Sequence, residues 1–396
     1  MSHIIELGTQ ERLKLLFSYP NTPSTTEVLA DTIKHWFQQT LERDNLAARG
    51  ARVTVHVKGP DYSLELEGPP ELAASFRTYQ ERLPRFLDNG WDAFTRVIPR
   101  LIAEKRWDPS PTLDGPKPYK PWRFFLTLGT ALVHQRSLQF FHYPPIRLLE
   151  ESRDYLKDPV PERCEELLRE NGVAMEDVHL YEAIVDAVPI AAEDDQGSKK
   201  SDKGTHFGLI PIEDFSEYQM AQVRLLLNPA PNDARYTIPI VVYGSHPRQI
   251  FEKLYGVALP FNSAATVEII PGKKTPVMAT NHPYRFYATV QGGDSVGSGK
   301  ILPDDSARTT AMELMINDLA AARWQKVMAD NPSLDPQAVL SDCRDYWRSP
   351  AQQGRVEALV LRQGSLTYPE GDSLAYSYSV SLPEAVALSE LKRSAG

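Results

Sequence analysis

Alternation of apolar and polar residues is clearest near the amino terminus. Residues 52–57 and 62–67 alternate, and Gly59, Pro60 and Asp61 lie between the two runs. A period of two places one face of a strand against a core, and a short glycine-containing connection joins antiparallel neighbours. The pattern predicts a β-hairpin over residues 52–67. Residues 13–19 read as a further short strand that ends at Pro20.

Helical spacing flanks this hairpin on both sides. Residues 24–27 (Ser-Thr-Thr-Glu) have the spacing of a capping box, and apolar residues follow at helical intervals as far as Leu41. Residues 71–102 predict a long helical stretch that Pro84 and Pro99 interrupt. Residues 1–107 therefore predict an α+β segment.

Prolines mark the end of that segment. Residues 108–121 contain five of them, at positions 109, 111, 116, 118 and 121. Such a density excludes a helix or a central strand and favours a semi-rigid extended connector. The connector would lead into a larger α/β body over residues 122–396.

The body mixes helical and strand patterns. Pro239 places the strand predicted at 236–243 at a sheet edge or at a bulge. Asp335 and Pro336 are typical of a helix start. The predicted strands are 236–243, 265–270, 284–290, 356–361 and 374–380, and the predicted helices are 161–171, 248–255 (ended by Gly256) and a pair at 305–347. The expected fold class is mixed α/β. Residues 193–204, polar and without apolar anchors, predict a mobile loop, either a linker or an insertion within one domain.

Composition narrows the class of protein. Of 396 residues, 42% are hydrophobic and 24% charged, which is typical of a globular chain. The formal charge of −9 works against nucleic-acid binding, which gains affinity from cations that neutralise phosphates. In residues 123–147, basic residues alternate with aromatic residues, as they do on surfaces that bind single-stranded nucleic acid. A buried amphipathic segment has the same composition, and the net charge favours it.

The sequence contains no motif for metal binding, redox chemistry or membrane insertion. The two cysteines, Cys164 and Cys343, are far apart, and neither a CxxC nor an HExxH motif occurs. No cofactor or metal site is therefore predicted. Residues 1–12 lack the apolar core of a signal peptide, and uncharged apolar stretches fall short of the roughly 20 residues of a membrane span. These features predict a soluble, cytoplasmic protein without membrane contact.

A glycine-rich stretch at residues 292–301 resembles two catalytic motifs in part. As a phosphate-binding loop it has Asp294 at the first-glycine position and Ile301 where Ser or Thr should bind magnesium. Residues 293–297 match the GxSxG spelling of a nucleophile elbow. Several loop residues follow before the next helix, although an elbow enters its helix at once. Ser295 is thus an outlying candidate nucleophile.

Two His-Pro turns are candidate sites, and the second is the densest cluster of functional groups in the sequence. Ser245 and His246 lie where a strand leads into a helix, with Ser245 as the expected helix cap. The second turn, at residues 280–287, carries Asn281, His282, Tyr284 and Arg285, whose donors and titratable ring suit a carboxylate, a phosphate or a base edge. Turn chemistry alone also explains Asn281 and the proline that follows His282.

Two classes of function follow, and whether a reaction is catalysed stays open. The absence of a convincing catalytic motif favours a non-catalytic binding or assembly subunit of a cytoplasmic complex with protein partners. The alternative is a hydrolase- or transferase-type enzyme with a crevice at the two His-Pro turns, which requires these turns to lie side by side. Single-stranded nucleic-acid binding is a third, less favoured hypothesis.

Overall fold

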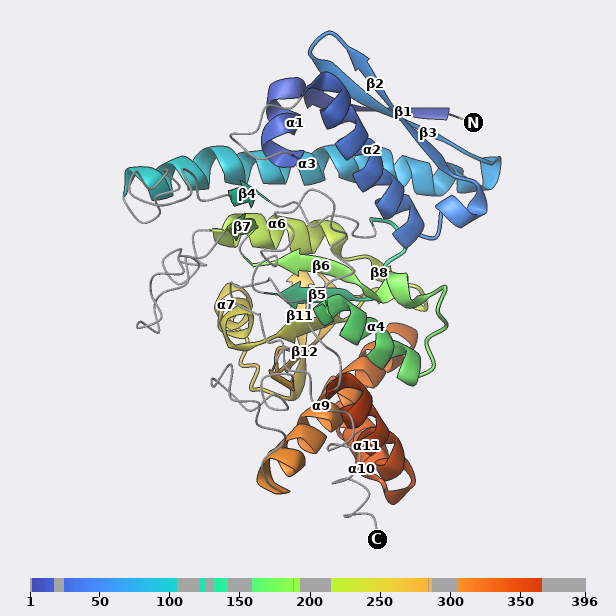
Figure 1. Cartoon of the computed structure of the whole chain (residues 1–396), viewed down its shortest axis with the longest axis vertical. Coiled ribbons are helices and arrows are strands. Elements are labelled where there is room, and N and C mark those ends of the chain that lie inside the picture. Colours follow the sequence, from blue (N-terminus) through green and yellow to red (C-terminus); the bar gives the residue numbers. More distant parts are fainter. Residues whose placement is uncertain are drawn as a thin grey trace.

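The computed structural model describes residues 2–17, 25–104, 122–124, 132–141, 159–187, 189–192, 215–283, 285–286 and 305–364. Helices and strands are mixed, so the predicted α/β class is confirmed (Figure 1). None of the described helices is long and apolar enough to cross a membrane. Residues 108–121, 193–204, 292–301 and 374–380, for which the sequence predicts specific structures, lie outside the described part of the chain.

An antiparallel sheet of three strands forms one end of the molecule (Figure 1). β2 (Arg52–Lys58) and β3 (Asp61–Glu67) make a hairpin at the predicted position, and β1 (Ser2–Thr9) pairs with β3. The strand predicted at 13–19 is wrong, because α1 (Gln10–Phe17) covers most of it. Leu13, Leu16 and Phe17 are buried along one side of α1, at the spacing of a helix.

Two helices pack against this sheet. α2 (Thr26–Arg43) begins one residue later than the capping-box spacing of residues 24–27 predicts, with Thr25 as the cap, whose Oγ1 accepts a hydrogen bond from Val28 N at 3.3 Å. α3 (Ala73–Ala103) continues through Pro84 and Pro99, so the predicted interruptions are wrong. A proline inside a helix costs about 3 kcal/mol. Burial of apolar side chains such as Leu83 and Leu87 offsets this at about 1.5–3 kcal/mol each. The short helices η1 (Ala47–Arg49) and η2 (Pro70–Leu72) flank the hairpin.

A larger sheet occupies the centre. Its strands β6 (Ala183–Asp186), β5 (Leu138–Phe141), β10 (Ile240–Tyr243) and β12 (Lys273–Thr280) are neighbours in this order and all run parallel. β9 (Asp233–Thr237), β8 (Pro229–Ala230) and β11 (Ser263–Ile270) extend the sheet, and β4 (Trp122–Phe124) pairs separately with β7 (Ile190–Ala192). The carboxyl ends of four strands therefore meet at one edge.

Proline and helical packing explain where three strand predictions differ from the structure. The strand predicted at 236–243 is split into β9 and β10, which both pair with β12, and Pro239 lies in the gap, not at a sheet edge. Residues 356–361 belong to α11 (Pro350–Gly364), because Val356, Leu359 and Val360 are buried at helical spacing. Arg285 and Phe286, within the strand predicted at 284–290, lie in a helical turn. β12 is not among the predicted strands.

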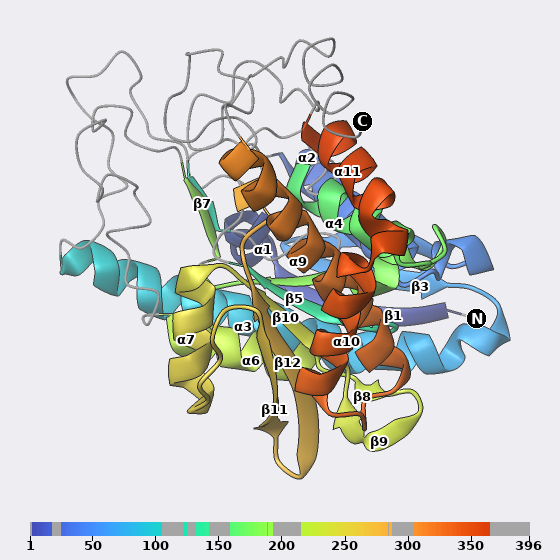
Figure 2. The same cartoon turned by 90° about the horizontal axis from the view of Figure 1, so that it is seen from below.

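Helices cover both faces of the central sheet (Figures 1 and 2). α6 (Ser216–Leu226) and α7 (Ser245–Tyr255) share one core with α3 and the amino-terminal sheet. The opposite core contains α4 (Pro159–Glu170), η5 (Val178–Tyr181), α9 (Asp305–Asp330), α10 (Pro336–Arg348) and α11. Consecutive strand residues alternate between the cores, so Phe140 faces the first and Phe141 the second.

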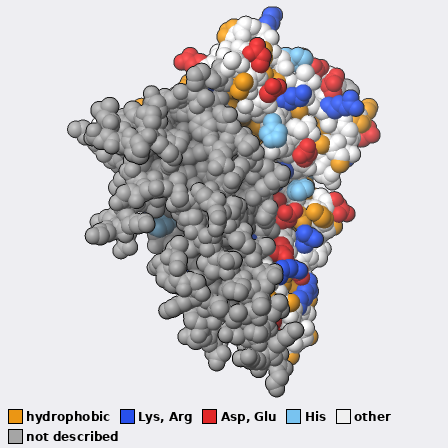
Figure 3. Space-filling view, viewed as in Figure 1, with side chains coloured by type: hydrophobic (Ala, Val, Ile, Leu, Met, Phe, Trp, Pro, Cys, Tyr) orange, Lys and Arg blue, Asp and Glu red, His pale blue; other side chains and the backbone are white. Residues whose placement is uncertain are grey.

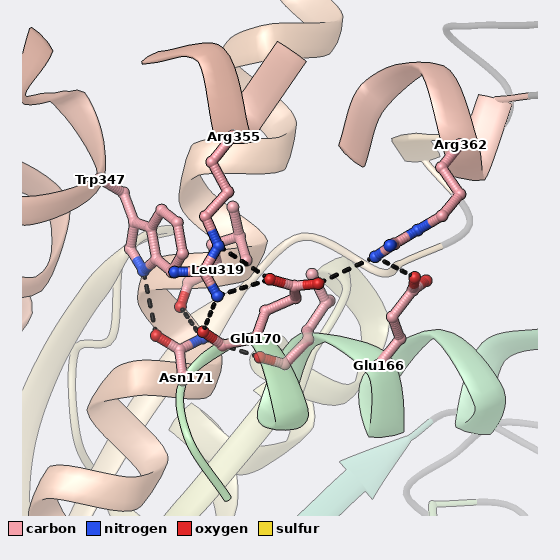
Figure 4. Close-up of polar contacts among 8 residues, drawn as sticks. Glu166, Glu170, Asn171, Leu319, Trp347, Arg355 and Arg362 are labelled. Atoms are coloured by element: carbon pink, nitrogen blue, oxygen red, sulfur yellow. Dashed lines mark hydrogen bonds and ion pairs between the residues drawn. The ribbon is translucent and has the colours of Figure 1, made fainter. Parts of the chain in front are cut away.

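Charged side chains fasten α11 to α4 (Figure 4). Arg355 donates from Nε and Nη2 to Glu170 Oε2 at 2.9 and 2.6 Å, and Arg362 Nη2 lies 2.5 Å from Glu166 Oε1 and 2.9 Å from Glu170 Oε1. Asn171, at the end of α4, is buried and accepts a hydrogen bond from Trp347 Nε1 of α10. These contacts connect the carboxyl-terminal helices to the sheet layer through α4.

Asp44 joins the amino-terminal layer to the central sheet. Its carboxylate, at the end of α2, is 1% exposed and accepts four hydrogen bonds of 2.6–2.9 Å, from Tyr79 Oη of α3 and from the backbone amides of Leu132, Val133 and His134. These three residues precede β5, the second strand of the parallel sheet. One side chain thus sets where β5 begins relative to α2 and α3.

Replacing Asp44 with alanine will destabilise the protein strongly. The variant leaves four donors without this acceptor, those of Tyr79 and Leu132 buried and those of Val133 and His134 half-buried. The free energy of unfolding should therefore fall by about 3–5 kcal/mol in urea titrations. Asp88→Ala is the matched control, because Asp88 makes an exposed ion pair with Arg12. Its loss should cost at most about 1 kcal/mol. Equal losses in both variants would contradict the role given to Asp44.

Candidate functional site at the carboxyl edge of the sheet

β10 and β12 end side by side. Tyr243 and Thr280 are register partners, and Gly244 N donates to Thr280 O at 3.0 Å. The turns that follow the two strands therefore start from adjacent positions. This arrangement is the one that a shared site at the two His-Pro turns requires.

Gly244 has a backbone conformation that favours glycine and lies close to the second turn. Its φ and ψ of 94° and 173° lie in a region that L-residues with a side chain avoid, and a Cβ atom there would lie 3.5 Å from His282 Cβ. Gly244 is also the residue before α7, and no side chain caps that helix. The prediction of Ser245 as the cap is wrong, since Ser245 is already the first residue of α7. Ser245 and His246 are both exposed.

His282 lies over an aromatic floor. Its ring meets the ring of Phe141 edge-on, with centroids 5.8 Å apart, and Phe141 stacks on Tyr243 at 4.6 Å. Burial disfavours the charged imidazolium and lowers the pKa of His282 to about 4. The imidazole is therefore neutral at neutral pH, and a neutral imidazole has one ring nitrogen that donates a hydrogen bond and one that accepts.

Asn281 and Arg285 act as a pair. The buried side chain of Asn281 accepts a hydrogen bond from Arg285 Nη1 at 2.8 Å, whereas Arg285 itself is exposed. The alternative in which Asn281 bonds only its own backbone is thus not what the structure shows. Arg285 N also donates to His282 O at 2.9 Å, which closes the turn.

Phe286 anchors this turn to the helices below. The guanidinium of Arg163 (α4) lies 4.1 Å from the centre of the Phe286 ring and 2.5 Å from the carboxylate of Asp318 (α9). Both charged groups are buried. Burial raises the pKa of Asp318 to about 6, although Arg163 opposes the shift. The position of the turn that carries His282 and Arg285 therefore depends on packing between α4 and α9.

Asp186 is a site residue that the sequence predictions miss. It is the last residue of β6 and the register partner of Phe141, and it is 2% exposed. Neither of its oxygens has a hydrogen-bond partner among the described residues. Burial raises its pKa to about 8, so the group is a neutral carboxylic acid at pH 7. An acid directly after the apolar run 183–185 was the available signal in the sequence.

The sequence contains other residues with reactive side chains. Tyr284 and Ser295 are outside the described residues. Cys164 and Cys343 are buried free thiols, and burial raises their pKa values to about 12 and 11. Within the described ranges, no three His, Cys, Asp or Glu side chains are grouped as metal ligands.

The described part of the aromatic and basic run 123–147 is largely used in packing. Phe140 and Phe141 are buried, His134 contacts Ser75, and Arg136 pairs with Asp330 at 2.6 Å. On the described surface that faces the viewer in Figure 3, acidic and basic side chains are interspersed.

Comparison of the chain with protein-family models, with curated protein sequences and with solved structures gives no match. The chemistry possible at the carboxyl edge of the sheet is therefore inferred from the side chains that lie there. It offers a neutral imidazole, a neutral carboxylic acid and an exposed guanidinium along the ends of parallel strands.

Substituting alanine for Gly244 will strain the site. The forbidden backbone conformation should cost about 1–3 kcal/mol in the free energy of unfolding, measured by urea denaturation. Gly256→Ala, at the other end of α7, is the control: its φ of 61° is left-handed and nothing lies within 4 Å of the added Cβ. Only Gly244→Ala should also shift the NMR signals of the His282 ring. An unchanged His282 spectrum would argue against the close approach of the two turns.

Proposed function

We propose that this protein is an enzyme of the hydrolase or transferase type whose crevice lies where β10 and β12 end. The observation that carries the proposal is the parallel pairing of these strands, which starts the turns of His246 and His282 from adjacent positions and puts Gly244 close to His282. In open α/β sheets, ligands bind outside the carboxyl ends of the strands. A buried acid without a hydrogen-bond partner among the described residues, Asp186 at the end of β6, lies at the same edge.

His282 suits the role of general base. A neutral imidazole can take a proton from water in a hydrolase, or from an acceptor hydroxyl in a transferase, while the oxygen attacks the substrate. Arg285 suits an anionic group of the substrate, and Asn281 holds its guanidinium in one direction. Ser245 and His246 would line the mouth of the crevice, since both are exposed at the start of α7.

A panel of 4-nitrophenyl esters, phosphates and glycosides tests the proposal. On the compound that the wild type turns over, His282→Ala should lower kcat by about 10²–10⁴-fold, because general base catalysis contributes that much. His246→Ala should have the smaller effect. His35→Ala is the matched control, an exposed histidine on α2 that should leave kcat unchanged. Full activity of His282→Ala, or no turnover of any compound by the wild type, would contradict an enzyme of this kind.

The pH dependence of kcat/KM gives a second check on His282. Its pKa is lowered to about 4, and the base must be unprotonated to act. Activity should therefore persist through pH 6.5, where an ordinary histidine titrates, and fall only as the pH approaches 4. A loss of kcat/KM below about pH 6.5 would indicate that another histidine is the base.

A non-catalytic assembly subunit of a cytoplasmic complex is the second proposal. It is favoured by β1, which pairs with β3 along one edge, while none of the described strands pairs with its other edge. Ile4 of β1 is also 57% exposed. A free strand edge can accept a strand from a partner protein. Purification of the tagged chain at native expression level, followed by mass spectrometry, should then recover a stoichiometric protein partner. Recovery of the chain alone would contradict a stable complex.

A further inference from the structure

We infer that Asp186 is the proton donor of the site at the carboxyl edge, acting on the leaving group of the substrate opposite the base His282. The inference rests on the proposed enzymatic function and deepens it. Three observations carry it: the position of Asp186 beside Phe141, the absence of any partner for its buried oxygens among the described residues, and the neutrality of both groups in the same pH range.

Asp186 lies at the same edge of the sheet as His282. Asp186 and Phe141 are register partners in a parallel pair, and Ala187 N continues the ladder to Phe141 O at 2.9 Å. Register partners project to the same face of a sheet. The ring of Phe141 in turn contacts His282. Asp186, through strand register, and His282, through ring contact, are thus both neighbours of Phe141 at the carboxyl edge of the sheet.

The missing partner separates Asp186 from the other buried acids. Asp44 accepts four hydrogen bonds, and Asp318 pairs with Arg163. Asp186 has neither kind of partner in the described part of the chain. Burying a carboxyl group without a hydrogen bond destabilises the fold, so a structural role does not explain it. A group on a ligand would supply the missing interaction.

The surroundings keep the acid protonated. β5 contributes Phe141, the register partner of Asp186. α6, in the core on the other side of the sheet, contributes Tyr218, and burial, with a smaller contribution from Asp186, raises the pKa of Tyr218. Gln219 of α6 donates to Ala187 O next to Asp186. With the pKa of Asp186 near 8 and that of His282 near 4, both groups are neutral between these values. Groups whose pKa values are driven apart in this way mark a division between acid and base.

In the proposed transfer step, every proton that is taken up is also released. His282 takes a proton from the attacking water or hydroxyl, while that oxygen forms the bond to the transferred group. The bond to the leaving atom breaks, its electron pair stays on the leaving atom, and Asp186 gives that atom a proton. The imidazolium then loses its proton to solvent and the carboxylate takes one up, so both residues return to their neutral forms.

The charge state of Asp186 can be tested without a substrate. In ¹³C NMR of the labelled full chain, one Asp carboxyl should titrate near pH 8, and this signal should be absent in Asp186→Asn. The unfolded state ionises near pH 4 and the folded state near pH 8. The stability of the wild type relative to Asp186→Asn should therefore fall as the pH rises from about 4 to 8 and level off above. Titration of Asp186 below pH 6 would overturn the inference.

The leaving group distinguishes a proton donor from a merely structural acid. Asp186→Asn keeps the size of the side chain but has no acidic proton. The comparison uses the class of compound that the screen identifies. Relative to the wild type, kcat/KM of Asp186→Asn should fall at least 100-fold when the leaving group is a phenol or an alcohol. It should fall less than 10-fold when the leaving group is 4-nitrophenolate, which departs without a proton. The alkaline limb near pH 8 should also disappear. Equal losses with both leaving groups would exclude the proton donor.

The same variants separate the two proposals. If His282→Ala is inactive and Asp186→Asn is fully active on both compounds, the role of Asp186 is wrong and the enzyme proposal stands. If neither variant changes turnover, the site itself is wrong. Asp318→Asn, which disturbs a buried acid that already has a partner, is the control for stability. It should lower the midpoint of unfolding without producing the dependence on the leaving group.

Discussion

Parallel pairing of β6, β5, β10 and β12 is the constraint on which the rest of the molecule depends. Parallel neighbours cannot be joined by a tight turn, so each connection must cross the sheet, and helices must cover both of its faces. α6 and α7 meet this need on one side, and α4, α9, α10 and α11 on the other. The same pairing collects the carboxyl ends of the strands at one edge. A single hydrogen-bonding pattern therefore determines both the layered architecture and the place where chemistry can occur.

Three buried acids show how differently this fold uses the same functional group. Asp44 accepts four hydrogen bonds and attaches the amino-terminal layer to the segment before β5. Asp318 pairs with Arg163, whose guanidinium supports the ring of Phe286 under the turn of His282. Asp186 has no partner among the described residues. The first two contacts stabilise the structure around the edge, and the third leaves hydrogen-bonding capacity unused at the edge itself. That contrast is the physical basis for assigning chemistry to Asp186.

Local sequence signals were reliable where an element is decided by its own residues. The hairpin of β2 and β3 and the start of α10 after Asp335 lie where the pattern predicts them, and the cap of α2 at Thr25 lies one residue after the predicted position. The errors concern short apolar segments, whose pattern is compatible with both a strand and a helix. Residues 10–17 and 356–361 are helical because the surfaces available to them accept a helical stripe. In α3, burial along the helix outweighs two prolines that would otherwise end it.

The sequence by itself determined the α/β class, the local starts and ends of many elements, and the residue types of the two His-Pro turns. It did not determine that these turns touch, because β10 and β12 are separated along the chain by α7 and β11, and only their pairing brings Gly244 against His282. Nor did it single out Asp186, since an acid after an apolar run is ordinary until the environment of its oxygens is known. The burial of Asp186 and the environment of its oxygens depend on residues that are far away in the sequence. Tertiary structure therefore decided which polar groups have hydrogen-bond partners among the described residues, and which of them lie together at the edge of the sheet.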